Sequence, residues 1–126
     1  MTVIVTDTGF AADDWDGPSI TLAPDTDPSD LKAHMNEPLI RIDFPSFSDG
    51  RGFTLARRLR DGGYVGRLRA TGHLIADQYA MARRSGFDEV ELDDAMARRQ
   101  PEDQWLARAD WRAHDPRERL RRPAAA

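Results

Sequence analysis

The chain has 126 residues, of which 40% are hydrophobic and 32% are charged, and its formal net charge is −4. This length favours one soluble globular domain and excludes a complete eight-stranded α/β barrel, which needs about 250 residues. The acidic balance argues against nucleic acid as a partner, because binding to phosphates depends on an excess of basic residues.

Some residue types and segments are missing, and this narrows the chemistry further. The chain contains no cysteine, which excludes disulfides, thiol catalysis and cysteine-ligated metal centres. No apolar run approaches the roughly 18 residues of a membrane-spanning helix. The first ten residues lack the basic and apolar regions of a signal peptide. We therefore expect a cytoplasmic protein that has no membrane partner.

The charges are distributed unevenly along the chain. Residues 1–37 contain eight acidic residues and a single lysine, so they carry −7 while the remainder carries +3. This distribution suits an acidic segment that lies over a more basic body. Residues 113–126 are rich in arginine and end in Pro-Ala-Ala-Ala. We expect a single α/β domain with an N-terminal lead-in over residues 1–112, followed by a basic, disordered tail.

Strand patterns recur along the first three quarters of the chain. An alternation of apolar and polar residues predicts four strands, at residues 19–23, 39–44, 66–71 and 89–92. Residues 3–5 form a short β-branched run that we interpret as an edge strand, and residues 9–18 read as a loop.

Helix signals lie between and after these strands. The predicted helices begin at Pro28, with Asp27 as the capping residue, and then cover about residues 52–61, 73–85 and 94 onwards. Strands that alternate with helices imply right-handed crossovers and parallel pairing. We therefore predict a small parallel sheet of about four strands, either open or shaped like half a barrel. No Gly-x-Gly-x-x-Gly motif follows a strand, so we expect no dinucleotide cofactor.

One face of the predicted sheet is charged, because successive side chains of a strand point to opposite faces. The apolar residues of each strand share one face, which leaves on the other face Arg41, Asp43, Arg67, Arg69, Glu89 and Glu91. Three interpretations fit this pattern. The charges form a solvated or ion-paired layer covered by the acidic N-terminal segment, they bind a ligand, or Arg41, Asp43, Arg69 and Glu91 form a homodimer or partner interface.

Turn-forming residues follow two of the strands and suggest an anion site. The loop Ser48-Asp49-Gly50-Arg51-Gly52 begins one helix, and Gly72-His73 begins the next on the same edge of a parallel sheet. Free backbone N–H groups at helix starts, together with the Arg51 guanidinium, are suited to sulfate, sulfite or phosphate. In the alternative interpretation the glycines serve a tight turn and Arg51 pairs with Asp49.

The sequence identifies no metal site and leaves the catalytic residues unknown. The three histidines His34, His73 and His114 are too dispersed to show the spacing of metal ligands. If the chain is an enzyme, Asp43 or His73 is the candidate acid or base. We predict neither a metal nor an organic cofactor.

The run IDFPSFSDGRGF, from Ile42 to Phe53, is the most distinctive stretch of the chain. Together with the Leu-Arg-Ala at 68–70, the Asp-Gln at 77–78 and the Gly-Phe-Asp at 86–88, it resembles an uncharacterised bacterial family, domain of unknown function 934. The resemblance is strongest over residues 39–92. His73 departs from it, because the family usually has an acidic residue after the Arg-Ala-x-Gly run.

The resemblance implies a role beside assimilatory sulfite reductase, since genes of this family commonly neighbour those of sulfate assimilation. Its members are often labelled oxidoreductases, but this sequence has no cysteine or nucleotide motif that would move electrons. We therefore expect an accessory protein that binds sulfite reductase or a sulfur oxyanion. Two alternatives stay open: a small enzyme acting on an oxyanion or a phosphorylated metabolite, and a homo-oligomeric scaffold.

Overall fold

A six-stranded open sheet forms the centre of the computed structural model, which describes residues 2–112. Its strands, in the spatial order β2-β1-β6-β5-β4-β3, are β1 (Val3–Thr6), β2 (Gly9–Ala12), β3 (Ile20–Leu22), β4 (Leu39–Phe44), β5 (Arg67–Gly72) and β6 (Glu89–Leu92). The last four are parallel, and their register places Arg41 beside Arg69 and Arg69 beside Glu89. The predicted α/β class and parallel core are thus confirmed, and the sheet is open.

The first two strands form an antiparallel hairpin that the sequence did not predict. β1 pairs with β2 on one side and with β6 on the other, both antiparallel, so it is an internal strand and not the expected edge. Residues 9–12, expected in a loop, form the edge strand instead. The turn between the strands depends on Gly9, whose φ of 119° is accessible to glycine at little cost, and on the Thr6 hydroxyl, which donates to the Gly9 carbonyl.

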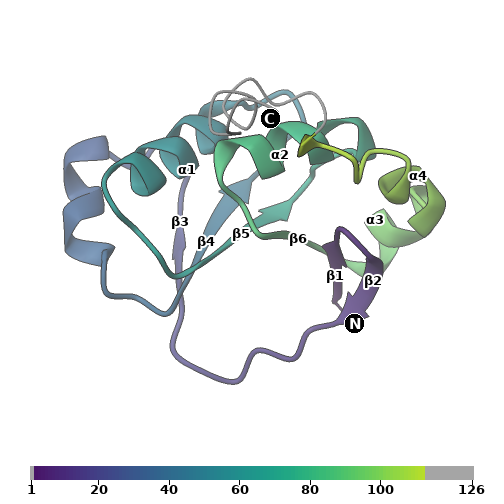
Figure 1. Ribbon diagram of the computed structural model, residues 1–126, viewed down its shortest axis with the longest axis horizontal. Helices are drawn as coiled ribbons and strands as arrows, with labels where there is room; N and C mark the ends of the chain where they lie inside the picture. Colours follow the sequence, from purple (N-terminus) through teal and green to yellow (C-terminus); the bar gives the residue numbers. More distant parts are fainter. Residues whose placement is uncertain (1, 113–126) are drawn as a thin grey trace, which may run out of the picture.

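The helices all cover one face of this sheet, as Figure 1 shows. They are η1 (Pro28–His34), α1 (Arg51–Asp61), η2 (Ala76–Gln78), α2 (Tyr79–Ser85), α3 (Asp94–Arg99) and α4 (Glu102–Leu106). Asp27 caps η1 as predicted, and Gly86 ends α2 with a φ of 115°. The helix expected from His73 begins only at Ala76, because the backbone N–H groups of Ile75 and Ala76 are held by the side-chain amides of Gln78 and Gln100.

The hydrophobic core lies between the sheet and the helix layer. Its aromatic members, all buried, are Phe44, Phe53, Tyr64, Tyr79, Phe87 and Trp105. Phe44 contacts both Phe53 and Phe87 in tilted or edge-on geometry, with ring centroids 4.9 and 5.8 Å away. The centre of the core therefore lies directly beneath the end of β4, the strand that leads into the Gly-Arg-Gly loop.

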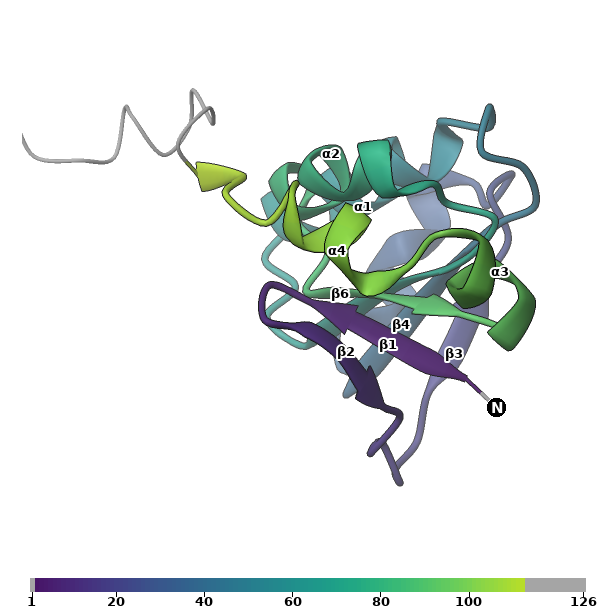
Figure 2. The same ribbon diagram turned by 90° about the vertical axis from the view of Figure 1, so that its right-hand side faces the viewer.

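Among residues 2–112, no helix covers the opposite face of the sheet (Figure 1). Residues 13–18, here called the strap, leave β2 at one edge and cross beneath the sheet to β3 at the other (Figures 1 and 2). No helix of the described residues is long and apolar enough to cross a membrane. The predicted tail, residues 113–126, and His114 within it lie outside the described residues.

Candidate functional site

The carboxyl ends of β4, β5 and β6 meet at one edge of the sheet, here called the carboxyl rim. Parallel pairing places the loops after Phe44, Gly72 and Leu92 side by side, because each strand enters its crossover at the same edge. This arrangement brings the two predicted anion-binding segments, Ser48–Gly52 and Gly72-His73, to the same rim.

Asp49 occupies the donors of the Gly-Arg-Gly loop. Its Oδ1 accepts from the backbone N–H and the Nε of Arg51, and its Oδ2 lies 2.7 Å from Arg51 Nη2. These hydrogen bonds from Arg51 lower the pKa of the Asp49 carboxyl below its ordinary value. The guanidinium therefore faces a carboxylate of its own loop, as the tight-turn interpretation expected. Ser48 also forms its hydrogen bond within the same loop, since its hydroxyl lies 2.9 Å from that of Ser46.

The two glycines of this loop have different surroundings. A Cβ at Gly52 would collide with the ring of Phe44, so this glycine lets the first turn of α1 lie against the core. A Cβ at Gly50 would meet only one atom, 4.0 Å away on Phe53. Close packing of α1 on β4 thus accounts for Gly52, whereas nothing in the packing requires a glycine at position 50.

The backbone at Gly72-His73 is also engaged within the protein. Gly72 has a φ of 116°, and the next residue, His73, donates its backbone N–H to the Phe44 carbonyl at 2.9 Å. The His73 side chain is exposed. The backbone N–H of His73, which was predicted to bind an anion, therefore links the end of β5 to β4. The imidazole of His73 is exposed to solvent.

A small polar pocket opens beside His73 at the rim. It has a volume of about 170 Å³ and is lined by Thr2, Thr71, Gly72, His73, Glu91, Leu92 and Asp93. Its carboxylates are already hydrogen bonded: Glu91 accepts from the Thr71 hydroxyl, and Asp93 accepts from the backbone N–H of Met96 at the start of α3. The pocket combines a histidine with acidic and hydroxyl groups, which are the side chains of acid–base chemistry.

An apolar depression lies on the other side of His73. It has a volume of about 370 Å³ and is lined by Phe47, His73, Ile75, Met96, Arg99 and Gln100. The Phe47 side chain is 56% exposed, while its carbonyl accepts from Gln78 Nε2 at 2.6 Å and so fixes the loop. Sequence reasoning missed this surface, because Phe47, Ile75 and Met96 come from three separate segments. Phe47 lies in the run from Ile42 to Phe53, but no pattern in the sequence links it to Ile75 or Met96.

The polar side of the sheet is an ion-paired layer beneath the strap. We define the charged face as Arg41, Arg67, Arg69, Glu89 and Glu91. Arg69 is fully buried and donates to Glu89 at 2.6 Å and to Glu91 at 2.7 Å. Arg41 also donates to Glu91, at 3.1 Å, and Arg67 to Glu89, at 2.8 Å. Asp43 takes no part in these pairs and lies instead beside Gly72, toward the rim.

The electrostatics of this layer favour its charged form. Burial alone would lower the pKa of Arg69, but its hydrogen bonds to Glu91, Glu89 and Asp13 outweigh burial and raise it. In the structure these charged residues pair with one another and with Asp13 and Asp14 of the acidic N-terminal segment, and their use as a ligand site or an interface stays a prediction. Within residues 2–112, no group of three histidine, aspartate or glutamate side chains is placed to hold a metal ion.

A family model matches most of the chain. The model of a family described as a bacterial protein of unknown function, domain of unknown function 934, matches residues 19–114. No curated protein and no solved structure matches the chain. The matched region contains the carboxyl rim and the whole charged face but not the strap.

Proposed function

Because the chain belongs to the bacterial family domain of unknown function 934, we propose that it is an accessory protein of assimilatory sulfite reduction. In this role it binds sulfite reductase through the carboxyl rim and carries out no redox step of its own. The support is the family resemblance, which implies a place beside sulfate assimilation, together with the surface of the rim.

The exposed ring of Phe47 beside the apolar depression is the observation that carries the proposal. Four large hydrophobic side chains among the described residues are exposed, namely Phe47, Val65, Met81 and Leu106. Of these, only Phe47 lines the depression at the rim. Aromatic residues, methionine and arginine are enriched at protein interfaces, and this surface joins Phe47 to Met96 and Arg99.

A protein partner suits the rim better than a free oxyanion does. Asp49 holds both the Arg51 guanidinium and the first backbone N–H of α1, and its negative charge repels an incoming anion. A docking surface needs no such free donors, because its core gains free energy from burying apolar area.

Affinity capture from bacteria grown on sulfate tests this function. The tagged chain should retain sulfite reductase, and Phe47→Ser should reduce the recovered reductase about tenfold by removing the aromatic anchor. Val65→Ser is the matched control, because Val65 is 92% exposed and lies outside the depression. Recovery that is equal for both variants, or wild-type eluate without the reductase, would overturn the proposal.

Growth of a deletion strain gives an independent test. Loss of the gene should slow growth when sulfate is the sulfur source and leave growth on cysteine unchanged, because cysteine bypasses sulfite reduction. Equal growth on the two sulfur sources would remove the link to sulfite reduction even if a partner protein were captured.

The polar pocket favours a second candidate function, a small enzyme that acts on an oxyanion or a phosphorylated metabolite. Here His73 serves as the acid or base beside Thr71 and Glu91. This function requires that sulfite, sulfate or a phosphomonoester raise the melting temperature and that His73→Ala abolish the effect. No shift at tens of millimolar ligand would exclude it.

A further inference from the structure

Few contacts hold the strap against the charged face. Asp13 accepts from Arg69 at 3.2 and 3.3 Å, Asp14 lies 3.5 Å from Arg67, and the Trp15 ring lies 5.6 Å from the Arg67 guanidinium carbon. Every strap residue except Trp15 is exposed. Outside the sheet ladders, no backbone–backbone hydrogen bond of the described residues involves the strap. Between its two ends in β2 and β3, the strap therefore contacts the charged face through side chains alone.

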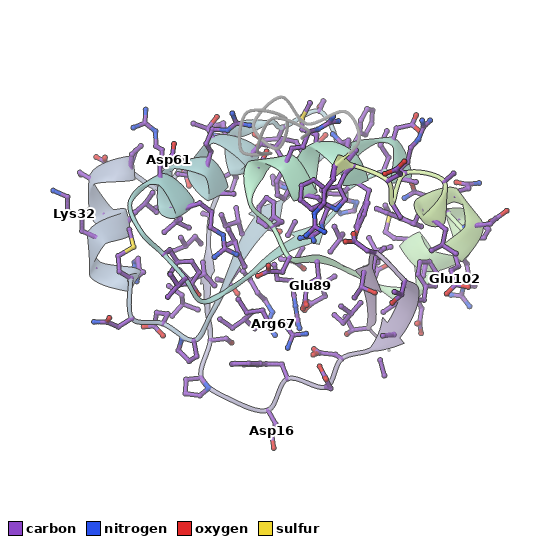
Figure 3. All side chains as sticks on the ribbon, in the orientation of Figure 1. Asp16, Lys32, Asp61, Arg67, Glu89 and Glu102 are labelled. Carbon is purple, nitrogen blue, oxygen red and sulfur yellow. The ribbon has the colours of Figure 1, made fainter. Side chains whose placement is uncertain are left out.

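The charged face, in contrast, is organised without the strap. The bonds from Arg69 to Glu89 and Glu91, at 2.6 and 2.7 Å, are shorter than those it makes to Asp13. Two glutamates thus hold the Arg69 guanidinium in place, while its Nη2 donates to Asp13. Figure 3 shows Arg67 pointing from the sheet toward the strap, whereas Asp16 points away from it. The glutamates thus hold Arg67 and Arg69 through hydrogen bonds that do not involve the strap.

The composition of the face defines what fits it. Three arginines stand against two glutamates, which leaves an excess of positive charge, and the strap supplies Asp13 and Asp14. A flat aromatic ring on Arg67 completes the contact through a cation–π interaction. The complementary ligand is thus an extended chain with two adjacent carboxylates followed by an aromatic side chain, since arginine forks favour carboxylates.

The family model matches the charged face but not the strap that covers it. It begins at residue 19, so all five residues of the charged face lie inside the matched region and the strap lies outside it. The binding groups thus lie within the region that the family model matches, and the strap directly precedes that region.

We propose that the charged face is a recognition site for an acidic segment of a partner protein, and that the strap occupies this site in cis as a removable competitor. A partner segment gains the Arg67 and Arg69 donors only when Asp13, Asp14 and Trp15 leave them. The inference concerns a different surface from the carboxyl rim and does not depend on docking there.

A labelled peptide of strap sequence, residues 11–19, tests this inference by fluorescence anisotropy with the full chain. The triple variant Asp13→Asn/Asp14→Asn/Trp15→Ala frees the face, so it should bind the peptide about tenfold more tightly than the wild type does. The control peptide, with asparagine at its first two aspartates, should not bind. Raising the salt concentration should weaken the specific complex, because its contacts are ionic.

The double variant Asp14→Asn/Trp15→Ala guards against loss of folding, because it keeps Asp13 as a partner for buried Arg69. If the triple variant unfolds, the double variant should still bind the peptide about threefold more tightly than the wild type. Equal binding to variant and wild type, no binding to either, or unfolding of the double variant would overturn the proposal. Tighter binding of single-stranded DNA than of the peptide would also overturn it, by assigning the face to phosphates.

Discussion

The hydroxyl of Tyr79 on α2 donates a hydrogen bond to the carboxylate of Asp7, in the turn between β1 and β2, although 72 residues separate the two. Arg83 donates to the same carboxylate through Nε and Nη2, at 3.1 Å each, and Trp111 donates through Nε1 at 3.2 Å. Burial raises the pKa of Tyr79, so its hydroxyl stays a donor. One carboxylate therefore joins the hairpin to the helix layer.

Asp7 should make stability depend on pH in the acid range. Burial alone would raise its pKa, but hydrogen bonds from Arg83, Tyr79 and Trp111 outweigh burial and lower it. A carboxyl group with a lowered folded-state pKa stabilises the fold above its unfolded pKa, and this contribution is lost as the pH falls through the folded value. Asp7→Asn should cost about 1 kcal/mol at neutral pH, because the side chain is partly exposed and screened.

Urea unfolding measures this effect. The difference in unfolding free energy between wild type and Asp7→Asn should shrink as the pH falls below about 4. A difference that stays constant across that range would show that Asp7 acts by packing and not by charge.

Replacement of Gly52 should damage the core more than replacement of Gly50. A Cβ at position 52 meets the Phe44 ring, so Gly52→Ala should lower the free energy of unfolding by about 2 kcal/mol through overpacking. Gly50→Ala has open space and should change it by less than about 0.5 kcal/mol. Chemical denaturation of the two variants decides, and equal losses would contradict the packing explanation of the Gly-Arg-Gly motif.

Arg69 should be essential to the fold, whereas Arg51 should not. Arg69→Met leaves buried Glu89 with Arg67 as its remaining partner, which should cost about 3 kcal/mol. Arg51→Met breaks a pair at the surface and should leave the melting temperature unchanged. Calorimetry on both variants tests the contrast, which fails if Arg69→Met melts at the wild-type temperature.

Removing the charge of Asp49 should create anion affinity at the start of α1. In Asp49→Asn the Arg51 guanidinium loses its carboxylate partner and becomes available to sulfate. We expect sulfate to raise the melting temperature of Asp49→Asn more than that of the wild type. The double variant Asp49→Asn/Arg51→Ala should lose the gain. A larger shift in the wild type would show instead that Asp49 does not block the loop.

The parallel core could be predicted because its strands follow simple local rules. Apolar and polar residues alternate along the sequences of β4, β5 and β6, as expected of strands. The start of η1 follows from the capping residue Asp27 and from Pro28. The charged face follows from the same alternation, and its cover by acidic residues was one of three interpretations that the sequence left open. These features depend on residues that are neighbours in the sequence or that recur periodically along it. Both kinds of signal can be read from a single sequence.

Other features depend on contacts between residues that are distant in the sequence, and no sequence pattern predicts these contacts. β2 has the sequence Gly-Phe-Ala-Ala, which lacks β-branched residues, and it is a strand only because β1 pairs with it. The late start of η2 depends on Gln100, which is distant in sequence. The apolar depression at the rim likewise joins three segments. The structure was needed to show that Asp49 accepts from Arg51 and that the Phe44 carbonyl accepts from the backbone N–H of His73. Both donors had been predicted to bind an anion.

The position of β1 imposes an order on folding. Its Val5 pairs with Val90, and the backbone N–H of Phe10 donates to Glu102, so the hairpin finds its neighbours in segments that are synthesised much later. Contacts between such distant parts of a chain form slowly, because a long loop must close before they are made. The nascent protein must therefore keep the β1–β2 hairpin unpaired with β6 until β6 itself has left the ribosome.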